Sequence, residues 1–299
     1  MTISAERVGT WYRADGSEAL QYVMSADDLV TDPAELRAAI DAGMRITVSS
    51  GSSPASVTSL DFLEPVIDDV QDLWVGTVDR VVGANILQNA RLLRSLAFAA
   101  GACSDRPDLS SLPHLEEFSG GVTRTTASVL RNPDLRFLRV EGVIPKSFAR
   151  VAGRLEVFEH HGARSATELP VFEHPESMRR MLRVGPSRFD LRQLEGMTNL
   201  AEFRLNVCGE VTGLASLARL PHLSRLQFNG VATREDWADV PVVGSGAMLD
   251  ITPYPSGSAL ASWAAAGWIL PDRPASPVDA ITLDEAGDGE VWGVFIAQF

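Results

Sequence analysis

Cysteine, lysine and long apolar runs are scarce in this sequence. Its 299 residues include two cysteines and one lysine, Lys146, so almost every positive charge is an arginine. Two cysteines cannot make the disulfide framework of a small secreted domain in a chain of this length. No stretch is apolar over the roughly 20 residues that a membrane-spanning helix requires, and residues 1–10 lack the basic start and apolar run of a secretory signal. These absences predict a cytoplasmic protein without membrane contact.

Excess positive charge is also missing. The formal net charge is -13, whereas a protein that binds nucleic acid gains affinity by covering phosphates with a basic surface. Nucleic acid is therefore excluded as the expected ligand. An acidic surface fits a basic protein partner, although charge retained for solubility is the simpler explanation.

What the sequence does have is an internal repeat. Apolar residues recur at a first position and at three and five residues after it, as in Leu93, Leu96 and Phe98. Successive first positions are separated by 23, 22, 20, 20, 23, 22 and 23 residues. Such even spacing indicates stacked units, because no single unit can bury its apolar side alone. The eight first positions are Val70, Leu93, Leu115, Leu135, Leu155, Met178, Leu200 and Leu223.

Each unit is predicted to hold one short strand and one return segment. The apolar residues at +3 and +5 suit a strand, because side chains alternate between the two faces of a sheet. Upstream, apolar residues at steps of three, as in Leu214, Leu217 and Leu220, suit a short 3₁₀ turn.

The repeats are irregular in places. Three units have Gly120, His160 or Arg183 at +5, where the others have an apolar residue. In the unit that contains Arg183, a change of register would bring Leu182 and Val184 into the core instead. Both registers are open at this unit.

The stretch Leu200-Ala-Glu-Phe203-Arg-Leu205-Asn-Val-Cys208 resembles the leucine-rich-repeat consensus L-x-x-L-x-L-x-x-N/C. Residues 214–228 resemble the internalin-like bacterial repeats of about 22 residues. The resemblance spans residues 60–231 and implies an α/β leucine-rich-repeat solenoid with a parallel concave sheet. The sequence departs from the consensus at +8, which in most units lacks Asn or Cys. That position holds Gly101, Thr123, Val143, Ala163 and Val231.

A non-repeat cap is predicted at the N-terminal end, over residues 1–59. It should contain a hairpin around Asp15-Gly16, a helix that begins at Pro33 after the N-cap Asp32, and a strand over 44–49. Gly43 suits the left-handed residue that ends the helix. The solenoid itself, with about eight repeats, is assigned to residues 60–231.

The apolar ladder is predicted to stop after Val231, so that residues 232–299 form a C-terminal α/β cap or small module. We expect a strand over 248–254, a helix over 259–269 and a hairpin within 280–296. A lid is the simpler interpretation, because an open repeat array needs its last apolar face covered. The alternative is a separate binding module that uses Trp263, Trp268 and Trp292.

The two cysteines are predicted to be packing residues. Cys103 and Cys208 belong to units five apart, which places them roughly 25 Å from each other at the usual spacing of neighbouring strands. That separation is far beyond the reach of a disulfide. Both are expected as reduced thiols in the core.

No group of residues points to catalysis or to a metal. His160, His161 and His174 suggest a metal site, but no cysteine or carboxylate completes a tetrahedral set at a recognisable spacing. The glycine-rich stretches 51–54 and 244–246 lack the lysine and following helix of a phosphate-binding loop. No catalytic residue, metal or cofactor is therefore predicted.

The concave face of the sheet is the predicted binding surface. If the residues at +3 and +5 point into the core, those at +2, +4 and +6 point away from it. They include aromatic, arginine and carboxylate side chains, which are common at binding surfaces. The predicted partner-binding residues are Asp72, Trp74, Glu117, Phe137, Arg139, Glu141, Glu159, His161, Arg180, Glu202, Arg204, Asn206, Arg225, Gln227 and Asn229.

Three functions are compatible with this pattern. The first is a non-enzymatic protein-protein interaction module that docks a partner on the concave face, for example an immunity protein or antitoxin that masks a basic toxin. The second is an effector or enzyme with its activity in residues 232–299 and the repeats as substrate selector. The third is a scaffold subunit of a larger assembly.

Overall fold

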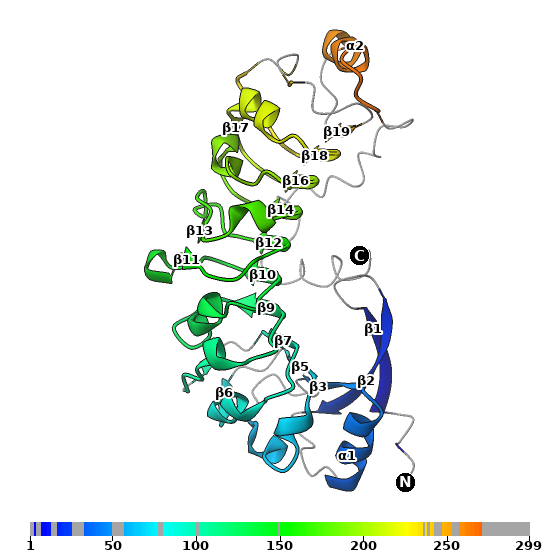
Figure 1. The fold of residues 1–299 in the computed structure, drawn as a ribbon, viewed down its shortest axis with the longest axis vertical. Helices are drawn as coiled ribbons and strands as arrows, with labels where there is room; N and C mark the ends of the chain where they lie inside the picture. Colours follow the sequence, from blue (N-terminus) through cyan, green and yellow to red (C-terminus); the bar gives the residue numbers. More distant parts are fainter. Residues whose placement is uncertain are drawn as a thin grey trace.

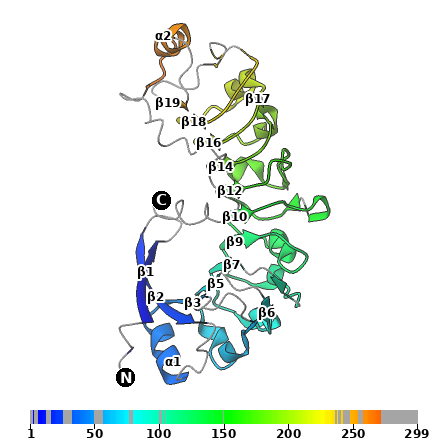
Figure 2. The same ribbon diagram turned by 180° about the vertical axis from the view of Figure 1, so that it is seen from behind.

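The computed structural model describes residues 3, 7–12, 17–25, 33–49, 57–76, 80–99, 102–103, 105–148, 150–235, 237, 240–241, 247–252 and 257–270. These residues form an arc (Figures 1 and 2). One long sheet follows the inner side of the arc, and short helical segments follow the outer side. The arrangement is that of a solenoid, in which each unit contacts its neighbours.

The long sheet has twelve strands, of which the first two pair antiparallel and all later neighbours pair parallel. Parallel neighbours require a crossover, which the return segments provide. In order across the sheet the strands are β1 (Val8–Tyr12), β2 (Glu18–Ser25), β3 (Arg45–Ser49), β5 (Asp72–Val75), β7 (Ser95–Phe98), β9 (Glu117–Gly121), β10 (Phe137–Glu141), β12 (Val157–His161), β14 (Arg180–Val184), β16 (Glu202–Asn206), β18 (Arg225–Asn229) and β19 (Met248–Thr252).

The eight units predicted from the repeat are confirmed as the strands β5 to β18 of the long sheet. Their +3 and +5 residues are buried and lie in register, so that Leu138 is aligned with Phe118 on one side and Phe158 on the other. In the ambiguous unit, Met181 and Arg183 keep this register and are fully buried. The apolar residues therefore merge into one continuous core.

The sheet extends beyond the eight predicted units. Leu249 of β19 is aligned with Leu226 and is buried, so the prediction that the ladder stops after Val231 is wrong. The sequence predicted a strand here, over residues 248–254, but not as part of the ladder, because the first position of this unit is Gly246 and not a leucine. At the other end, Ile46 of β3 is aligned with Leu73. The division at residues 59 and 231 stays a prediction.

The return segments contain 3₁₀ helices, as the steps of three predict, and short parallel strands. The 3₁₀ helices are η2 (Asp61–Leu63), η3 (Ile67–Asp69), η4 (Ala84–Asn89), η5 (Leu109–Ser111), η6 (Ala127–Arg131), η7 (Lys146–Phe148), η8 (Pro175–Ser177), η9 (Leu191–Leu194) and η10 (Leu214–Arg219). The short strands are β4 (Val57–Ser59), β6 (Arg80–Val82), β8 (Ala102–Cys103), β11 (Arg150–Val151), β13 (Val171–Phe172), β15 (Phe189–Asp190) and β17 (Val211–Thr212).

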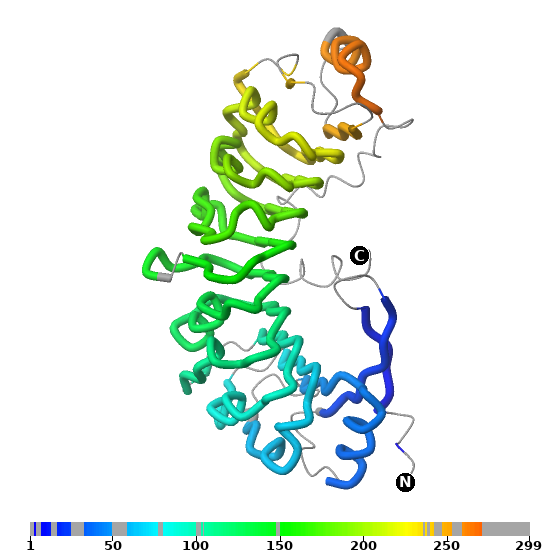
Figure 3. Tube along the Cα trace, viewed as in Figure 1, coloured from blue at the N-terminus to red at the C-terminus, as the bar shows by residue number. Residues whose placement is uncertain are grey.

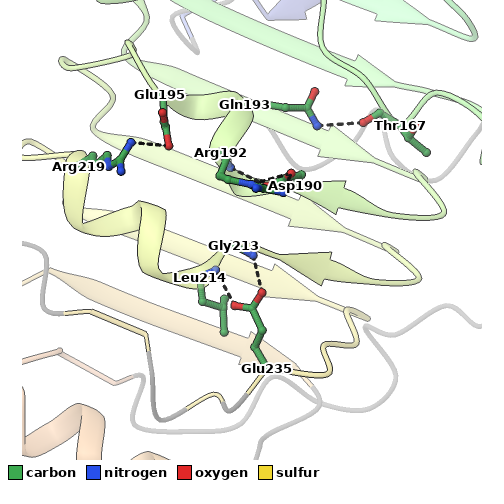
Figure 4. Close-up of polar contacts among 9 residues, drawn as sticks. All are labelled: Thr167, Asp190, Arg192, Gln193, Glu195, Gly213, Leu214, Arg219 and Glu235. Carbon is green, nitrogen blue, oxygen red and sulfur yellow. Dashed lines mark hydrogen bonds and ion pairs between the residues drawn. The ribbon is translucent and has the colours of Figure 1, made fainter.

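Polar side chains connect neighbouring return segments (Figure 4). The carboxylate of Glu235 accepts hydrogen bonds from the backbone N–H groups of Gly213, at 2.6 Å, and Leu214, at 2.9 Å. The amide of Gln193 donates to the carbonyl oxygen of Thr167 at 3.1 Å. The contacts of Glu235 satisfy the N–H groups at the start of η10, which have no partner within the helix.

The side chain of Asn132 also connects two neighbouring return segments through hydrogen bonds, but it lies in the core. Its Nδ2 donates to the carbonyl oxygens of Leu109, at 3.0 Å, and Leu112, at 2.9 Å, and its Oδ1 accepts from the N–H of Asp134 at 2.9 Å. The side chain is completely buried. It replaces the apolar residue that other units have at this position, and it joins two units through hydrogen bonds.

Asn132→Ala is expected to lower the free energy of unfolding by about 2 to 3 kcal/mol, because it leaves buried backbone groups without partners. Asn199→Ala is the matched control, since Asn199 also donates to a carbonyl, that of Glu176, but is exposed. Asn199→Ala should lower the free energy of unfolding by less than about 1 kcal/mol. Chemical denaturation of both variants measures this, and equal losses would contradict the proposed importance of burial.

The helix α1 (Pro33–Asp41) lies beside the β1–β2 hairpin at the N-terminal end of the arc (Figure 3). It begins at Pro33 as predicted, and Gly43, with φ of 70°, adopts the left-handed conformation after its end. Leu36 and Ile40 lie on its buried side. The predicted N-cap Asp32, the Asp15-Gly16 turn and the hairpin within 280–296 lie outside the described residues.

The helix α2 (Gly257–Ala265) lies at the other end of the arc. It begins two residues before the predicted start, and it ends before Gly267, whose φ is 91°. Trp263 and Trp268 are buried, and the indole N–H of Trp263 donates to the carbonyl oxygen of Trp237 at 2.8 Å. The hypothesis that these two tryptophans present a binding surface is therefore wrong for both. Trp292 lies outside the described residues.

Both cysteines are free thiols. Cys208 is buried in the core as expected, and its thiol is 3.2 Å from the carbonyl oxygen of Glu210. Cys103 differs from the prediction, because it is only half-buried in the short outer strand β8. Of the helices that the structure describes, none has the length and apolar character to cross a membrane.

Candidate functional site

The inner face of the sheet carries the fifteen residues predicted to bind a partner. They lie at the alternate positions of β5, β9, β10, β12, β14, β16 and β18, on the side opposite the core. Arg180 and Arg225 are exposed, and the other thirteen are half-buried. The geometry therefore places these side chains on one surface. Their role in binding stays a prediction.

Glu202 is the centre of the charged part of this face. Its carboxylate lies 2.5 Å from a guanidinium nitrogen of Arg204, 3.3 Å from Arg180 and 3.6 Å from Arg225. The three arginines come from three adjacent strands, β14, β16 and β18. We call these four residues the arginine cluster.

A second ion pair lies further along the face. The carboxylate of Glu159 is 4.0 Å from Nε of Arg139. Burial raises the pKa of Glu159, while the charges of Arg139, Arg180 and Arg204 oppose that change. The Nε of Arg139 is buried without a hydrogen-bond partner. Each strand from β10 to β18 thus places at least one charged side chain on this face, although Leu182 of β14 is aligned between Glu159 and Arg204.

His161, next to this pair, is an uncharged residue at neutral pH. Burial lowers its pKa to about 4, and the positive charge of Arg139 acts in the same direction. An unfolded chain takes up a proton on this histidine near its ordinary pKa of about 6.5. The unfolded state therefore binds more protons than the folded state between about pH 6.5 and pH 4, and the contribution of His161 to stability falls as the pH is lowered through this window.

His161→Gln is expected to flatten the dependence of the free energy of unfolding on pH between 7 and 4, because glutamine does not titrate. Denaturant titrations of both proteins at several pH values test this. His114→Gln removes an exposed histidine and serves as the control. An unchanged pH dependence in His161→Gln would contradict the expectation.

The aromatic residues of the face occupy separate places. Trp74 lies in β5 and Phe137 in β10, with β7 and β9 between them. A Cβ added at Gly76 would lie 2.6 Å from the Trp74 ring, so the indole lies over this glycine. The missing side chain at residue 76 thus makes room for the ring on the face.

Two regions of the face were missed by the sequence pattern because their strands lie outside the eight units. On β19, Asp250 accepts a hydrogen bond from Nε2 of Gln227 at 3.2 Å, and burial raises the pKa of Asp250. On β3, the guanidinium of Arg45 lies 3.0 Å from the centre of the Trp11 ring. Both strands were predicted, over residues 44–49 and 248–254, but an alignment of Ile46 and Leu249 with the repeat would have been needed to place them in the long sheet.

Behind the face, His160 and Arg183 form a polar pair within the core. His160 is buried as its +5 position predicts, and Arg183 is fully buried beside it. Arginine can only donate, so Nδ1 of His160 accepts from Nη1 of Arg183 and Nε2 donates to the carbonyl oxygen of Gly142 at 2.7 Å. Nη2 of Arg183 donates to the carbonyl oxygen of Ala166. Burial lowers the pKa of Arg183 to about 10.

The described part of the chain contains no group of three or more His, Cys, Asp or Glu residues arranged to hold a metal. His174, considered in the sequence as a third histidine, lies outside the core and contacts Glu176 at 3.3 Å. A groove of about 730 Å³ follows the amino ends of β9 to β18. Two of its arginines, Arg136 and Arg179, pair with Glu156, at 3.0 Å and 3.8 Å.

Comparisons with known proteins agree with the architecture. No family model matches the sequence, and a search of the curated proteins finds no match. Among solved structures, an internalin (inlF) from Listeria monocytogenes matches with a TM-score of 0.52 at 13% identity, over 81% of this chain and 77% of that chain. Internalin C2 (inlC2) from the same species matches with a TM-score of only 0.25 at 11% identity, over 70% of this chain and 69% of that chain.

The second similarity is too low to carry an argument, and the first concerns the fold. It agrees with the long, mostly parallel sheet described above. The chain therefore has the fold of a leucine-rich-repeat protein, an α/β solenoid with a parallel sheet on its inner side.

Proposed function

We propose that this chain is a non-enzymatic interaction module that binds a protein partner through the inner face of its sheet. The observation that carries the proposal is the charged network on that face, which consists of the Arg139–Glu159 ion pair and the arginine cluster around Glu202. Solenoids of this kind use their extended concave surface for binding. Side chains held by ion pairs also lose less conformational entropy when a partner docks.

The aromatic residues supply the apolar part of the proposed interface. Trp74 and Phe137 are half-buried, so each still has surface to lose when a partner binds. Aromatic anchors and arginines contribute most of the binding energy in many protein interfaces. We propose that Trp74 and Phe137 act as anchors and that the charged network orients the partner.

Affinity capture with the full chain, followed by calorimetry with the isolated partner, tests this function. Trp74→Ala or Phe137→Ala should weaken binding by about 10-fold or more, which corresponds to at least about 1.4 kcal/mol. Val171→Ala is the matched control, because Val171 is an exposed apolar residue on the outer strand β13. Equal affinities for all three variants would overturn the inner face as the binding surface.

A finer form of the proposal is an immunity protein or antitoxin that works in the cytoplasm and masks a basic toxin. The net charge of -13 supports it, because opposite net charges accelerate association. Co-expression with the captured partner tests this form. Growth arrest by the partner alone, relieved by this chain, is the expected result, and a harmless partner would contradict it.

A further inference from the structure

The centre of the inner face has the opposite charge to the chain as a whole. The formal net charge of the protein is -13. In the arginine cluster, however, three guanidiniums surround one carboxylate within 4.0 Å. The cluster is therefore locally positive in an acidic protein.

Two of the three positive groups are also more exposed to solvent than the negative one. The side chain of Glu202 is 17% exposed, whereas those of Arg180 and Arg225 are 50% and 46% exposed. A molecule that approaches the face meets these two guanidiniums before it meets the carboxylate. The surface offered to a partner is a pair of hydrogen-bond donors with positive charge.

Neighbouring acidic groups do not cancel this charge. Glu159 interacts with Arg180 and Arg204 of the cluster, but it also pairs with Arg139, which brings its own positive charge. Asp250, on the next strand, lowers the local charge through its interaction with Arg225, but it forms a hydrogen bond with Gln227. Counting Arg139, Glu159 and Asp250 with the arginine cluster gives four arginines against three carboxylates, so positive groups remain in excess.

The register sets the distance between the two exposed arginines. Arg180, Glu202 and Arg225 are aligned across β14, β16 and β18, so Arg180 and Arg225 are two strand spacings, or about 10 Å, apart. Both guanidiniums already share the single carboxylate of Glu202. Each keeps donor groups for another acceptor, and a carboxylate is the acceptor that guanidinium binds most strongly and in two-pronged geometry.

We propose that the arginine cluster is a binding site for the carboxylates of an acidic segment of the protein partner. This inference rests on the proposed function, because it names the chemistry of the partner at the centre of the same face. It also differs from the expectation of a basic partner. The net charge describes the whole molecule, whereas contact depends on the charges within a few ångströms.

Peptide titration of the full chain tests the site without the partner. The probes are acetyl-Glu-Gly-Glu-Gly-Glu-amide and the same peptide with glutamine at each glutamate, measured by NMR at low ionic strength. The glutamate peptide should bind at least about 10-fold more tightly, and its affinity should fall as salt is added. Inorganic phosphate is a further probe. Binding of phosphate with no binding of the glutamate peptide would overturn the assignment to carboxylates.

Matched variants locate the site. Arg180→Gln combined with Arg225→Gln should weaken glutamate-peptide binding by about 10-fold or more. Arg179→Gln combined with Arg219→Gln is the control, because both are exposed and ion-paired but lie away from the face. Thermal melting should show that both pairs of changes leave the fold intact, since exposed ion pairs contribute little to stability.

The variant Glu202→Gln is expected to change the affinity for the glutamate peptide in the opposite direction. Loss of the carboxylate removes the competing acceptor of Arg180 and Arg225, so glutamate-peptide affinity should rise several-fold. If the arginine cluster had only a structural role, the affinity for the glutamate peptide would not rise.

Equal binding of the glutamate and glutamine peptides, or equal effects of the face variants and the control variants, would overturn the inference. If partner binding depends on Trp74 but not on the arginines, the proposed function is supported and only the carboxylate site is contradicted.

Discussion

Valine in place of His160 is expected to lower the free energy of unfolding by about 3 to 5 kcal/mol, the cost typical of leaving a buried charge without its partner. Arg183 is fully buried, and its Nη1 donates to Nδ1 of His160. Without the imidazole, the guanidinium keeps only the carbonyl oxygen of Ala166 among its described acceptors. The carbonyl oxygen of Gly142 also loses its donor.

The double variant His160→Val/Arg183→Leu should recover most of this loss. It removes the buried charge together with the group that solvates it, and replacing buried polar pairs by apolar residues is often close to neutral. The two new side chains would lie in register between Val140 and Leu205, both apolar and buried. We expect the double variant within about 2 kcal/mol of the natural protein.

Denaturant unfolding of the two single variants and the double variant measures the coupling between the two residues. His161→Val is the control for loss of an imidazole, because His161 is the next residue but points to the inner face. His161→Val should lower the free energy of unfolding by less than about 1 kcal/mol, because most substitutions outside the core have effects of this size. A double variant that is as unstable as the sum of its singles would contradict the expected coupling.

Alanine in place of Gly120 is expected to destabilise the protein by about 3 to 5 kcal/mol, in the range reserved for severe steric conflict in a core. Gly120 lies in β9 with φ of 146°, a backbone conformation that residues with a Cβ rarely adopt. A Cβ at this residue would overlap the carbonyl oxygen of Phe98 on the neighbouring strand. Since β7 and β9 are hydrogen-bonded neighbours, relief requires the two strands to separate.

Gly121→Ala is a closely matched control, because Gly121 is the next residue of the same strand. The nearest atom to a Cβ added there lies at 3.9 Å, an ordinary contact distance. Gly121→Ala is expected to lower the free energy of unfolding by less than about 1 kcal/mol. Thermal and chemical unfolding of the two variants should differ clearly, and similar stabilities would show that the strand pair accommodates a Cβ at Gly120.

The repeat could be predicted from the sequence because apolar spacing is set locally. A strand alternates its side chains between two faces, so leucines at +3 and +5 mark the buried face without knowledge of the neighbours. The same reasoning identified α1, whose start at Pro33 and end before Gly43 depend on backbone preferences of single residues. It predicted the strand β19 but did not assign it to the ladder, because the first position of that unit has no apolar residue.

The face could be predicted only as a set of residues. Alternation placed Glu202, Arg204 and Arg225 on the same side of their strands, and the structure agrees. Which arginines share which carboxylate depends on register across strands that are 22 or 23 residues apart in the chain. No pattern within one unit contains that information.

The sequence by itself determined the solenoid, the strand positions and the residues that lie on the inner face, since each follows from periodicity within the chain. Tertiary structure alone decided that Arg183 is buried with His160 as its partner and that three arginines converge on Glu202. It also decided that the inner face is positive at its centre while the whole chain is acidic. The physical reason is that burial and Coulomb interactions depend on distances in space, which stacking of the units sets.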